Sequence, residues 1–374
     1  MTSLAIVRQK YRPDGGAERF VASALSVLSK QNQLNISVLT RQWQGDNDAG
    51  FNIIECNPFK WGRVSREKGF ARSAREHFPD FDLVQSHERI PGCTIFRAGD
   101  GVHKCWLNQR SRILTPVQIT RMKNDRFHQY VMQSEKQMFE HPSLRAVICN
   151  STMVKDEICR EFDIDQSIIH VIYNSVDLDK FNPKLQKAHR QNTREQLHIP
   201  TDANVMLFVG SGFERKGLSA TISAVSNTGS HLIIVGKDKK QVKYQQLASS
   251  LNCEHRVHFV GVQSDPKVFY GAADGFILPT LYDPFPNVTL EAMASGLGVI
   301  TSNTCGTAEI ITNNQNGYVC DALDIESLTE SIKSFGDQQH ARKLGVNARL
   351  TVEPFTAKRL SNELLSLYNK ILKI

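Results

Sequence analysis

The chain has 374 residues, a length that predicts two domains and leaves ample chain for sizeable hydrophobic cores. Hydrophobic residues make up 40% of it and charged residues 22%, a composition that excludes a disordered or fibrous protein. The formal net charge of +7 fits an anionic partner without identifying it.

The N-terminal half begins a regular alternation of short apolar runs and helix-length segments. This alternation predicts a parallel sheet wrapped in helices. The strands expected in the first half are residues 4–7, 34–39, 51–54, 81–84, 146–149 and 171–173.

The second half repeats the plan, and a linker at 174–183 joins the two. Its expected strands are 205–209, 231–235, 257–260, 275–278 and 299–301. Its expected helices include 218–225 and 288–293, and a final amphipathic helix is expected at 356–372. Two doubly wound α/β units in tandem are the simplest interpretation.

Neither a spanning helix nor a signal peptide is expected. No apolar run is long enough to cross a bilayer, and Arg8, Lys10 and Arg12 follow directly on a short apolar start. The eight cysteines show no CxxC spacing, so neither a zinc site nor a disulfide framework is indicated. We therefore expect a cytoplasmic protein.

Two loops between a strand and a helix are suited to an anion. Gly15 and Gly16 let the backbone come close to a phosphate or sugar, although a tight turn is the simpler interpretation of a lone Gly-Gly pair. Arg215 and Lys216 precede the expected helix 218–225. Because a helix N-terminus repels cations, this pair predicts a compensating anion such as a diphosphate, with a solvated surface pair as the alternative.

The stretch 279–296 is the most informative part of the sequence. An expected strand leads into a proline-rich loop that carries Asp283, and a helix beginning near residue 287 carries Glu291. Carboxylates accept hydrogen bonds from the hydroxyls of a sugar or a ribose. The alternative is that Asp283 starts a turn and that Glu291 is an ordinary surface residue of the helix.

Asp283, Glu291 and the Ala-Met-Ala-Ser-Gly sequence that follows resemble the E-x7-E motif of retaining GT-B glycosyltransferases of family 4. Other segments agree with that family in order and spacing. They are residues 15–19, 171–177, 208–217 and 257–261. Together these segments span nearly the whole chain.

The resemblance implies the GT-B class of α/β fold, in which two Rossmann-like doubly wound domains face each other across a cleft. Residues 1–173 would form the acceptor-binding domain, with a basic amphipathic insertion at about 103–136. Residues 174–355 would bind the nucleotide-sugar donor, and the helix within 356–374 would return to the first domain.

The resemblance also implies roles for single residues on the donor side. Arg215 and Lys216 would bind the donor diphosphate and stabilise the leaving group without a metal or other cofactor. Gly15 and Gly16 would close over the phosphates, and Glu291 would hold the ribose. The transferred sugar would lie against Asp283, Phe285, Pro286, Asn287 and Val288.

Two departures from the family pattern leave the donor sugar open. The first carboxylate is Asp283 where the motif has Glu, and Pro286 stands where many members have Gly. UDP-glucose is the first choice because it is a frequent donor in the family.

Candidates for the acceptor side follow strands of the first domain. Asp100 is predicted to be the acceptor-side base or orienting group, with His103 as a second acceptor-binding candidate, because related enzymes place polar residues there. For His87, a catalytic role and an ordinary hydrogen-bonded loop position are equally open. The front-face mechanism proposed for retaining members needs no enzyme nucleophile, because the leaving phosphate takes the acceptor proton.

Most of the net excess of positive charge lies between residues 103 and 136, which contain seven Lys and Arg residues and only two acidic ones, Asp125 and Glu135. Apolar residues such as Trp106 and Tyr130 are interleaved with them, a mixture typical of a segment that binds anionic lipid. An ordinary amphipathic helix pair is the commoner explanation of such a segment.

This basic insertion is similar to that of the lipopolysaccharide core glucosyltransferases. We therefore expect a peripheral enzyme of the cytoplasmic face of the inner membrane that transfers a hexose to a lipid-linked anionic glycan. A family 4 transferase for another glycan and a GT-B-like nucleotide-sugar epimerase are the alternatives. No nucleic-acid-binding motif is present, so nucleic acid is not expected as a partner.

Overall fold

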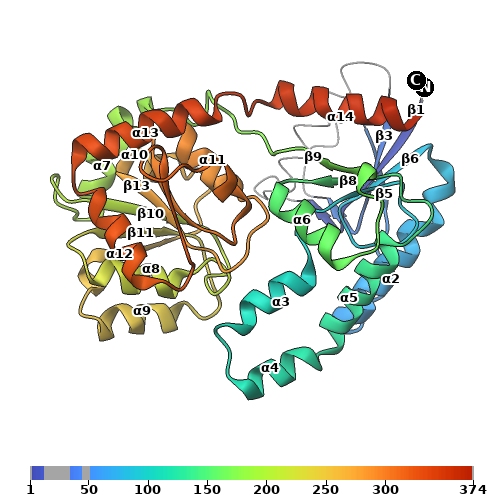
Figure 1. The fold of residues 1–374 in the computed structure, drawn as a ribbon, viewed down its shortest axis with the longest axis horizontal. Helices are drawn as coiled ribbons and strands as arrows, with labels where there is room; N and C mark the ends of the chain where they lie inside the picture. The colour runs from blue at the N-terminus through green and yellow to red at the C-terminus, as the bar shows by residue number, and fades with distance from the viewer. Residues whose placement is uncertain (1, 12–33, 44–50, 373–374) are drawn as a thin grey trace. The chain divides into compact units, whose positions relative to one another are not determined.

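The computed structural model describes residues 2–11, 34–43 and 51–372, and these form two compact units. Unit 1 comprises Met1–Asn174 and Ala357–Ile374, and unit 2 comprises Ser175–Thr356. Each unit contains one large parallel sheet with helices on both faces (Figure 1). The predicted fold class, two Rossmann-like doubly wound domains, is confirmed.

The sheet of unit 1 has seven strands in the order β5-β3-β1-β6-β7-β8-β9, all parallel. The strands are β1 (Thr2–Val7), β3 (Leu34–Thr40), β5 (Asn52–Glu55), β6 (Leu83–Ser86), β7 (Ile95–Arg97), β8 (Ala146–Cys149) and β9 (Ile169–Val171). A separate short pair joins β2 (Lys10–Tyr11) to β4 (Gln42–Trp43). The strand expected at 171–173 lies two residues earlier, as β9.

Alternate residues of these strands form the core under the last helix of the chain, α14 (Ala357–Leu372). Leu4 and Ile6 of β1 point to this face, and they pack in one cluster with Leu360 and Leu364 of α14. The hydroxyl of Tyr368 in α14 also donates a hydrogen bond of 2.5 Å to Gln85 Oε1. The last helix is therefore part of the core of unit 1.

Other helices of unit 1 cover the opposite face and the carboxyl edge of the sheet. Phe96 of β7 makes an edge contact with Phe139 of α5, with ring centres 5.5 Å apart. The helices are α2 (Gly62–Glu76), α3 (His103–Ser111), α4 (Pro116–Lys123), α5 (Arg126–Phe139) and α6 (Thr152–Glu161). The basic insertion thus forms three helices, α3 to α5, and not the helix pair considered above.

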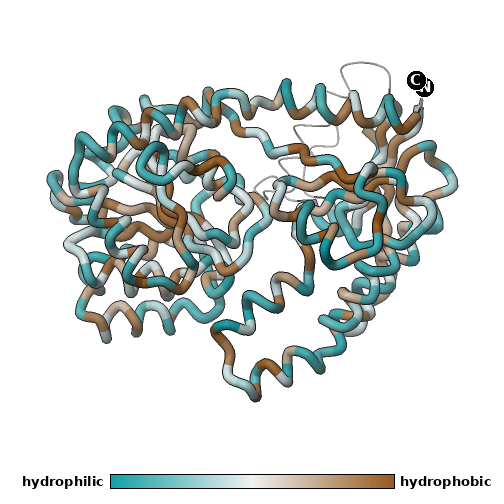
Figure 2. Tube along the Cα trace, in the orientation of Figure 1, coloured by the Kyte–Doolittle hydropathy of each residue, from teal (hydrophilic) through white to brown (hydrophobic). Residues whose placement is uncertain are grey.

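The sheet of unit 2 has six parallel strands in the order β12-β11-β10-β13-β14-β15. They are β10 (Val205–Val209), β11 (His231–Val235), β12 (Val257–Gly261), β13 (Gly275–Leu278), β14 (Gly298–Ser302) and β15 (Gly317–Cys320). β10, β11 and β13 are continuous buried apolar runs, as expected for a sheet covered on both faces (Figure 2).

Two layers of helices cover that sheet (Figure 1). One layer contains α8 (Leu218–Ser226), α9 (Gln241–Ser250) and α12 (Ile325–Ser334). The other contains α7 (Lys184–Gln196), α10 (Lys267–Ala272), α11 (Asn287–Ala294) and α13 (Gln338–Val352). None of the helices in the described ranges combines the length and apolar character that crossing a membrane requires.

Shortening Leu364 should destabilise unit 1, because this fully buried side chain fills space between α14 and the sheet. We expect Leu364→Ala to lower the free energy of unfolding by about 2–5 kcal/mol. All three tryptophans of the chain (Trp43, Trp61 and Trp106) belong to unit 1, so urea unfolding followed by tryptophan fluorescence measures this effect. The exposed Asn369→Ala on the same helix is the control, and an equal loss in both variants would contradict the packing of α14.

Candidate active site

The loop between β10 and α8 carries the predicted basic pair and lies against the segment that follows β13. Gly217 makes this close approach possible: its φ is +78°, and a Cβ atom there would lie 1.9 Å from the carbonyl oxygen of Pro279. The carbonyl of Arg215 accepts hydrogen bonds from Leu281 N and Thr280 Oγ1, both at 2.8 Å. The position of the basic pair is thus fixed by backbone geometry.

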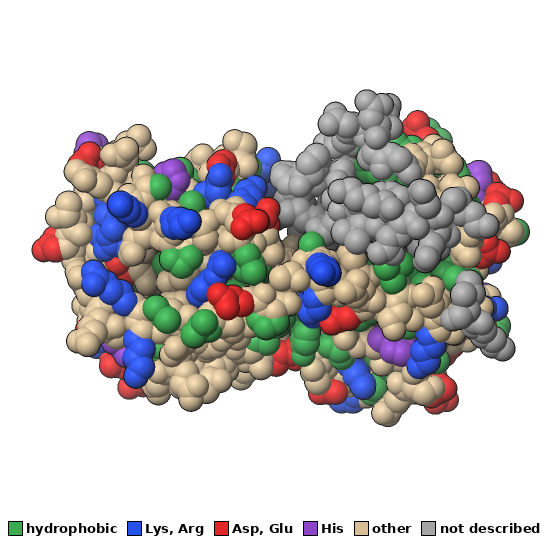
Figure 3. All heavy atoms as spheres, turned by 90° about the horizontal axis from the view of Figure 1, so that it is seen from above, with side chains coloured by type: hydrophobic (Ala, Val, Ile, Leu, Met, Phe, Trp, Pro, Cys, Tyr) green, Lys and Arg blue, Asp and Glu red, His purple; other side chains and the backbone are tan. Residues whose placement is uncertain are grey.

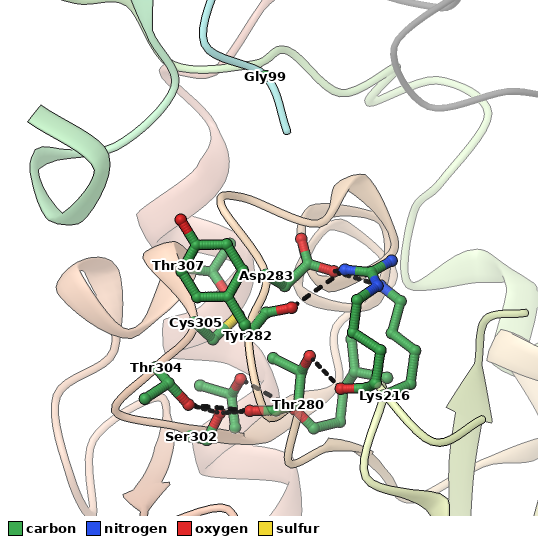
Figure 4. Close-up of polar contacts among 12 residues, drawn as sticks. Gly99, Lys216, Thr280, Tyr282, Asp283, Ser302, Thr304, Cys305 and Thr307 are labelled. Atoms are coloured by element: carbon green, nitrogen blue, oxygen red, sulfur yellow. Dashed lines mark hydrogen bonds and ion pairs between the residues drawn. The ribbon is translucent and has the colours of Figure 1, made fainter. Parts of the chain in front are cut away.

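Arg215 and Lys216 converge on Asp283 (Figure 4). Arg215 Nη1 lies 2.8 Å and Lys216 Nζ 2.5 Å from the same oxygen, Asp283 Oδ2. Lys216 and Asp283 are buried, with 7% and 6% of their surface exposed, whereas 38% of the Arg215 side chain is exposed. Three residues from the two sequence motifs therefore form one ion-pair cluster.

The charges of this cluster depend on one another. Burial raises the pKa of Asp283, but the positive charges of Lys216 and Arg215 and their hydrogen bonds outweigh this effect, so the pKa lies below its ordinary value. Burial lowers the pKa of Lys216, and the carboxylate of Asp283 partly offsets that shift. The carboxylate keeps both cations in place, with Lys216 buried and Arg215 partly open to solvent.

Two hydroxyl side chains at the end of β14 and just after it, which the sequence analysis missed, hold the Asp283 loop. Ser302 Oγ and Thr304 Oγ1 donate to the carbonyl of Thr280 at 2.5 and 3.0 Å. Asp283 N donates to the carbonyl of Thr304, and Gly306 N donates to the carbonyl of Asp283. Their place at the carboxyl end of the strand next to β13 is the signal that could have found them.

Glu291 lies in the second turn of α11 and is 2% exposed, so it is not the ordinary surface residue considered as an alternative. Its Oε2 accepts a hydrogen bond of 2.9 Å from the hydroxyl of Tyr270 in α10. This bond fixes the orientation of the carboxylate. Tyr270 is a second functional candidate that the sequence analysis did not select.

The segment between Asp283 and Glu291 leads directly into α11. Phe285 is buried and stacks on Phe355, with ring centres 6.5 Å apart. Pro286 is the N-cap of α11 and makes no side-chain capping bond, and Asn287 and Val288 are the first helical residues. The first N–H groups of a helix lack partners within the helix, so they can donate hydrogen bonds to an electronegative atom of a ligand.

Of the predicted acceptor-side residues, His87 is the most enclosed. It is 5% exposed, and its ring nitrogen Nε2 lies 3.1 Å from Gln85 Nε2. Burial, with the charges of Arg97 and Arg8, holds the pKa of His87 well below its ordinary value. His87 is therefore a neutral buried histidine, and its catalytic role stays a prediction.

Asp100 is exposed at the carboxyl edge of the unit 1 sheet, directly after β7. Arg8 lies between it and Glu88: Arg8 Nη1 is 3.9 Å from Asp100 Oδ2 and 3.4 Å from Glu88 Oε1. Burial raises the pKa of Glu88. Arg8 and Glu88 are candidates that the sequence analysis missed, although both follow a strand at the same edge of the sheet.

His103 begins α3 and lines a small cavity of about 170 Å³ with Glu88, Arg89 and Tyr130. Its Nε2 lies 3.0 Å from His128 Nδ1, and burial and the nearby Arg89 lower the pKa of His103 to about 3. This cavity is thus lined by one of the predicted acceptor residues, His103. Gly15 and Gly16 lie outside the described residues.

A larger cavity of about 760 Å³ in unit 2 lies at the opposite edge of its sheet, where Asp274 precedes β13 and Leu297 precedes β14. The face of unit 2 seen in Figure 3 carries Lys and Arg side chains among hydrophobic ones. Ligands of doubly wound folds bind at the carboxyl edge, so this cavity is not assigned to the donor. Within the described residues, no group of three metal-ligating side chains comes together.

Two glycosyltransferase family models match the chain. "Glycosyltransferase Family 4" matches residues 14–180 and "Glycosyl transferases group 1" matches residues 189–351. The chain is a glycosyltransferase. The resemblance to GT-B enzymes of family 4, drawn from motifs in both units, is confirmed.

Relatives agree with this assignment. Lipopolysaccharide glucosyltransferase WaaG of Escherichia coli is 24% identical over 88% of each chain. The "Uncharacterized glycosyltransferase MJ1607" of Methanocaldococcus jannaschii is 33% identical, but the match spans about half of each chain, 46% of this one and 45% of the other.

Solved structures share the fold of this glycosyltransferase. The crystal structure of WaaG, a glycosyltransferase involved in lipopolysaccharide biosynthesis, has a TM-score of 0.81 at 22% identity and covers 96% of this chain and 98% of that one. Anabaena Alr3699/HepE in complex with UDP-glucose has a TM-score of 0.75 at 16% identity and covers 99% of this chain and 100% of that one.

Replacing Asp283 by Asn should destabilise unit 2, because two cations then lose the carboxylate between them. We expect a loss of about 3 kcal/mol, measured by thermal melting with circular dichroism. The exposed Asp202→Asn is the control.

The loss should depend on pH in a defined direction. Because the folded-state pKa of Asp283 lies below its ordinary 3.8, its stabilisation is present above that value and disappears as the pH falls through the folded-state pKa. The difference between wild type and Asp283→Asn should therefore persist from about pH 8 to about pH 5 and shrink below about pH 4. A difference that grows with acid would show that the assigned charge state is wrong.

Proposed function

We propose that this glycosyltransferase transfers a hexose, glucose from UDP-glucose, with retention of configuration to a lipopolysaccharide core or a similar anionic lipid-linked glycan. The observation that carries the proposal is the cluster of Arg215, Lys216 and Asp283 at the carboxyl edge of the unit 2 sheet. Full-length similarity to WaaG supports the acceptor, and the UDP-glucose bound by the similarly folded HepE supports the donor.

The basic pair binds the donor diphosphate in this proposal. Arg215 is partly exposed and its guanidinium has five N–H donors, so it can contact phosphate oxygens while it keeps its bond to Asp283. Lys216 adds a fixed positive charge from the buried side. As the bond to the sugar breaks, negative charge develops on the leaving diphosphate, and the two cations stabilise it without a bound metal.

Asp283 and Glu291 hold the two sugars of the donor. Both cation contacts use Asp283 Oδ2, and Oδ1 has no hydrogen bond from the described residues. Oδ1 is therefore the acceptor for a hydroxyl of the transferred hexose. Glu291, oriented by Tyr270, accepts hydrogen bonds from the ribose hydroxyls, and the backbone from Phe285 to Val288 lies along the hexose.

The reaction itself needs no enzyme nucleophile in this proposal. The acceptor oxygen bonds to the anomeric carbon on the face from which the diphosphate leaves, and the acceptor proton passes to the departing phosphate oxygen. Asp100 and His103 orient the acceptor, and Arg8 holds Asp100 and Glu88 at the same edge of unit 1. Gly15 and Gly16 close over the phosphates.

The helices α3 and α4 support an anionic membrane or glycan as the partner of unit 1. Val117 of α4 is 61% exposed, and Ile113, in the connection between α3 and α4, is 39% exposed. Arg112, Arg121 and Lys123 are exposed on the same helices or their junction. Exposed apolar groups beside cations favour the interface of an anionic bilayer, so we place the enzyme peripherally on the cytoplasmic face of the inner membrane.

Lys216→Ala and Glu291→Ala should each abolish glucose transfer, because each removes a group that contacts the donor. We also expect both variants to lose the rise in melting temperature that UDP-glucose gives the wild type. Lys239→Ala, an exposed cation of the same unit, is the control and should behave as wild type. Transfer at wild-type rates by both variants would contradict the donor site, and UDP-glucose turnover without acceptor would favour the epimerase.

Replacing Arg110, Arg112, Arg121 and Lys123 by Ser should weaken binding to vesicles that contain phosphatidylglycerol, because each cation near an anionic surface contributes to binding. Co-sedimentation at low and high salt measures the effect. Binding of the wild type should fall as salt rises, and the variant should show a smaller salt dependence. Equal vesicle binding by wild type and variant would contradict the membrane role of α3 and α4 and would leave the donor site untouched.

A further inference from the structure

Two large aromatic side chains of unit 1 are almost completely exposed. Phe59 is 91% and Trp61 is 85% exposed, and both lie in the loop of residues 57–61 between β5 and α2, here called the aromatic loop. Single exposed apolar residues are common on protein surfaces, but two neighbouring aromatic rings in water mark a surface that binds something.

The backbone of the aromatic loop is held at both ends. Arg41 Nη2 donates a hydrogen bond of 2.9 Å to the carbonyl of Pro58, and Trp61 N donates to Ser65 Oγ at 3.1 Å. The ring of Pro58 lies close to Gly69 of α2, where a Cβ atom would come within 3.2 Å of it. The loop therefore presents the two rings on a fixed backbone.

The aromatic loop is tied to the corner between α4 and α5. Arg63, in the first turn of α2, pairs with Asp125 at 2.9 Å, and its Cζ lies 4.4 Å from the centre of the Phe127 ring. Asp125 is the N-cap of α5 and follows α4 directly along the chain. The aromatic rings thus lie on the part of unit 1 that carries the basic helices.

Exposed apolar and basic groups coincide there. Among the described residues of unit 1, the large hydrophobic side chains that are exposed are Phe59, Trp61, Ile113 and Val117. Lys60 stands between the two rings and is exposed, as are Arg121 and Lys123 of α4. A neutral partner would leave these charges unmatched, whereas the headgroups of an anionic bilayer match both the charge and the aromatic rings.

We propose that the aromatic loop inserts Phe59 and Trp61 into the headgroup region of an anionic bilayer and anchors unit 1 beside α3 and α4. The indole of Trp61 has an apolar body and one N–H donor, which suits it to the boundary between headgroups and acyl chains. Lys60 contacts lipid phosphate between the two rings. This inference rests on the membrane role proposed above and adds a second, aromatic contact to it.

Lipids brominated on their acyl chains test the depth of Trp61 directly. Vesicles of phosphatidylglycerol that contain such lipids should quench the tryptophan fluorescence of the bound wild-type protein. Trp61→Phe keeps an apolar ring at this position, so it should still sediment with vesicles while most of the quenching is lost. The remaining tryptophans, Trp43 and Trp106, are both partly buried, and the quenching that Trp61→Phe retains measures their share.

Removing both rings tests their contribution to binding. Phe59→Ser with Trp61→Ser should weaken the partition onto the same vesicles on the order of tenfold, because two aromatic side chains no longer leave water. The control pair is Val242→Ser with Val262→Ser, which changes two exposed apolar residues of unit 2 and should leave partition unchanged.

Several results would overturn the proposal in distinguishable ways. Bound wild type without quenching, or equal partition of both double variants, would reject the aromatic anchor and leave the membrane role of α3 and α4 standing. No vesicle binding by the wild type would reject both. A dimer in solution that only the aromatic double variant dissociates would assign the rings to a second copy of this chain. A change in tryptophan emission that a soluble glycan alone causes in the wild type and not in Trp61→Phe would assign them to the acceptor.

Discussion

A carboxylate held between two cations is the interaction on which the site of unit 2 depends. Lys216 is almost fully buried, and burial alone favours its neutral form. Asp283 supplies the opposite charge at 2.5 Å, and Arg215 adds a second cation that is still open to solvent. The cluster has a net charge of +1 and a fixed geometry, so an arriving anion finds its binding groups already oriented.

The two units support their polar groups to different degrees. In unit 2 the Asp283 loop is bound to the ends of β10 and β14 by backbone and hydroxyl hydrogen bonds. In unit 1, the side chain of Asp100 is 58% exposed, and Arg8 Nη1 lies 3.9 Å from its Oδ2. The groups proposed to hold the donor in unit 2 are thus fixed by backbone hydrogen bonds, whereas the Asp100 side chain proposed to orient the acceptor in unit 1 is open to solvent.

Much of the fold could be predicted from apolar periodicity, because a parallel sheet covered on both faces needs continuous buried runs. β8, β10, β11 and β13 begin and end at the predicted residues. The strand expected at 81–84 lies at Leu83–Ser86, and all four of its residues are buried. Because Gln85 and Ser86 are polar, the apolar pattern ended two residues before the strand does. β15 was missed, since it is a run of only four residues that begins at a glycine, Gly317.

For the site, the sequence could indicate which residue types follow each strand but not which of them meet. It assigned Asp283 to the sugar and Arg215 and Lys216 to the phosphates, without the ion pairs that join all three. Tyr270 could not be recognised because a single hydroxyl has no distinctive spacing, whereas Ser302 and Thr304 could have been selected from their place at the carboxyl end of a strand. Phe59 and Trp61 also escaped notice, since exposure of an aromatic ring depends on what the folded chain leaves uncovered.

The membership of α14 in unit 1 has a consequence for how the chain can be divided. Unit 2 is one continuous stretch, Ser175–Thr356, set between two pieces of unit 1. The polypeptide therefore passes between the units twice, after Asn174 and after Thr356, so two connections join them instead of one. For the same reason unit 2 can be expressed as one continuous fragment. A stop codon before α14 would instead remove a helix from the core of unit 1, most of which is encoded at the start of the gene.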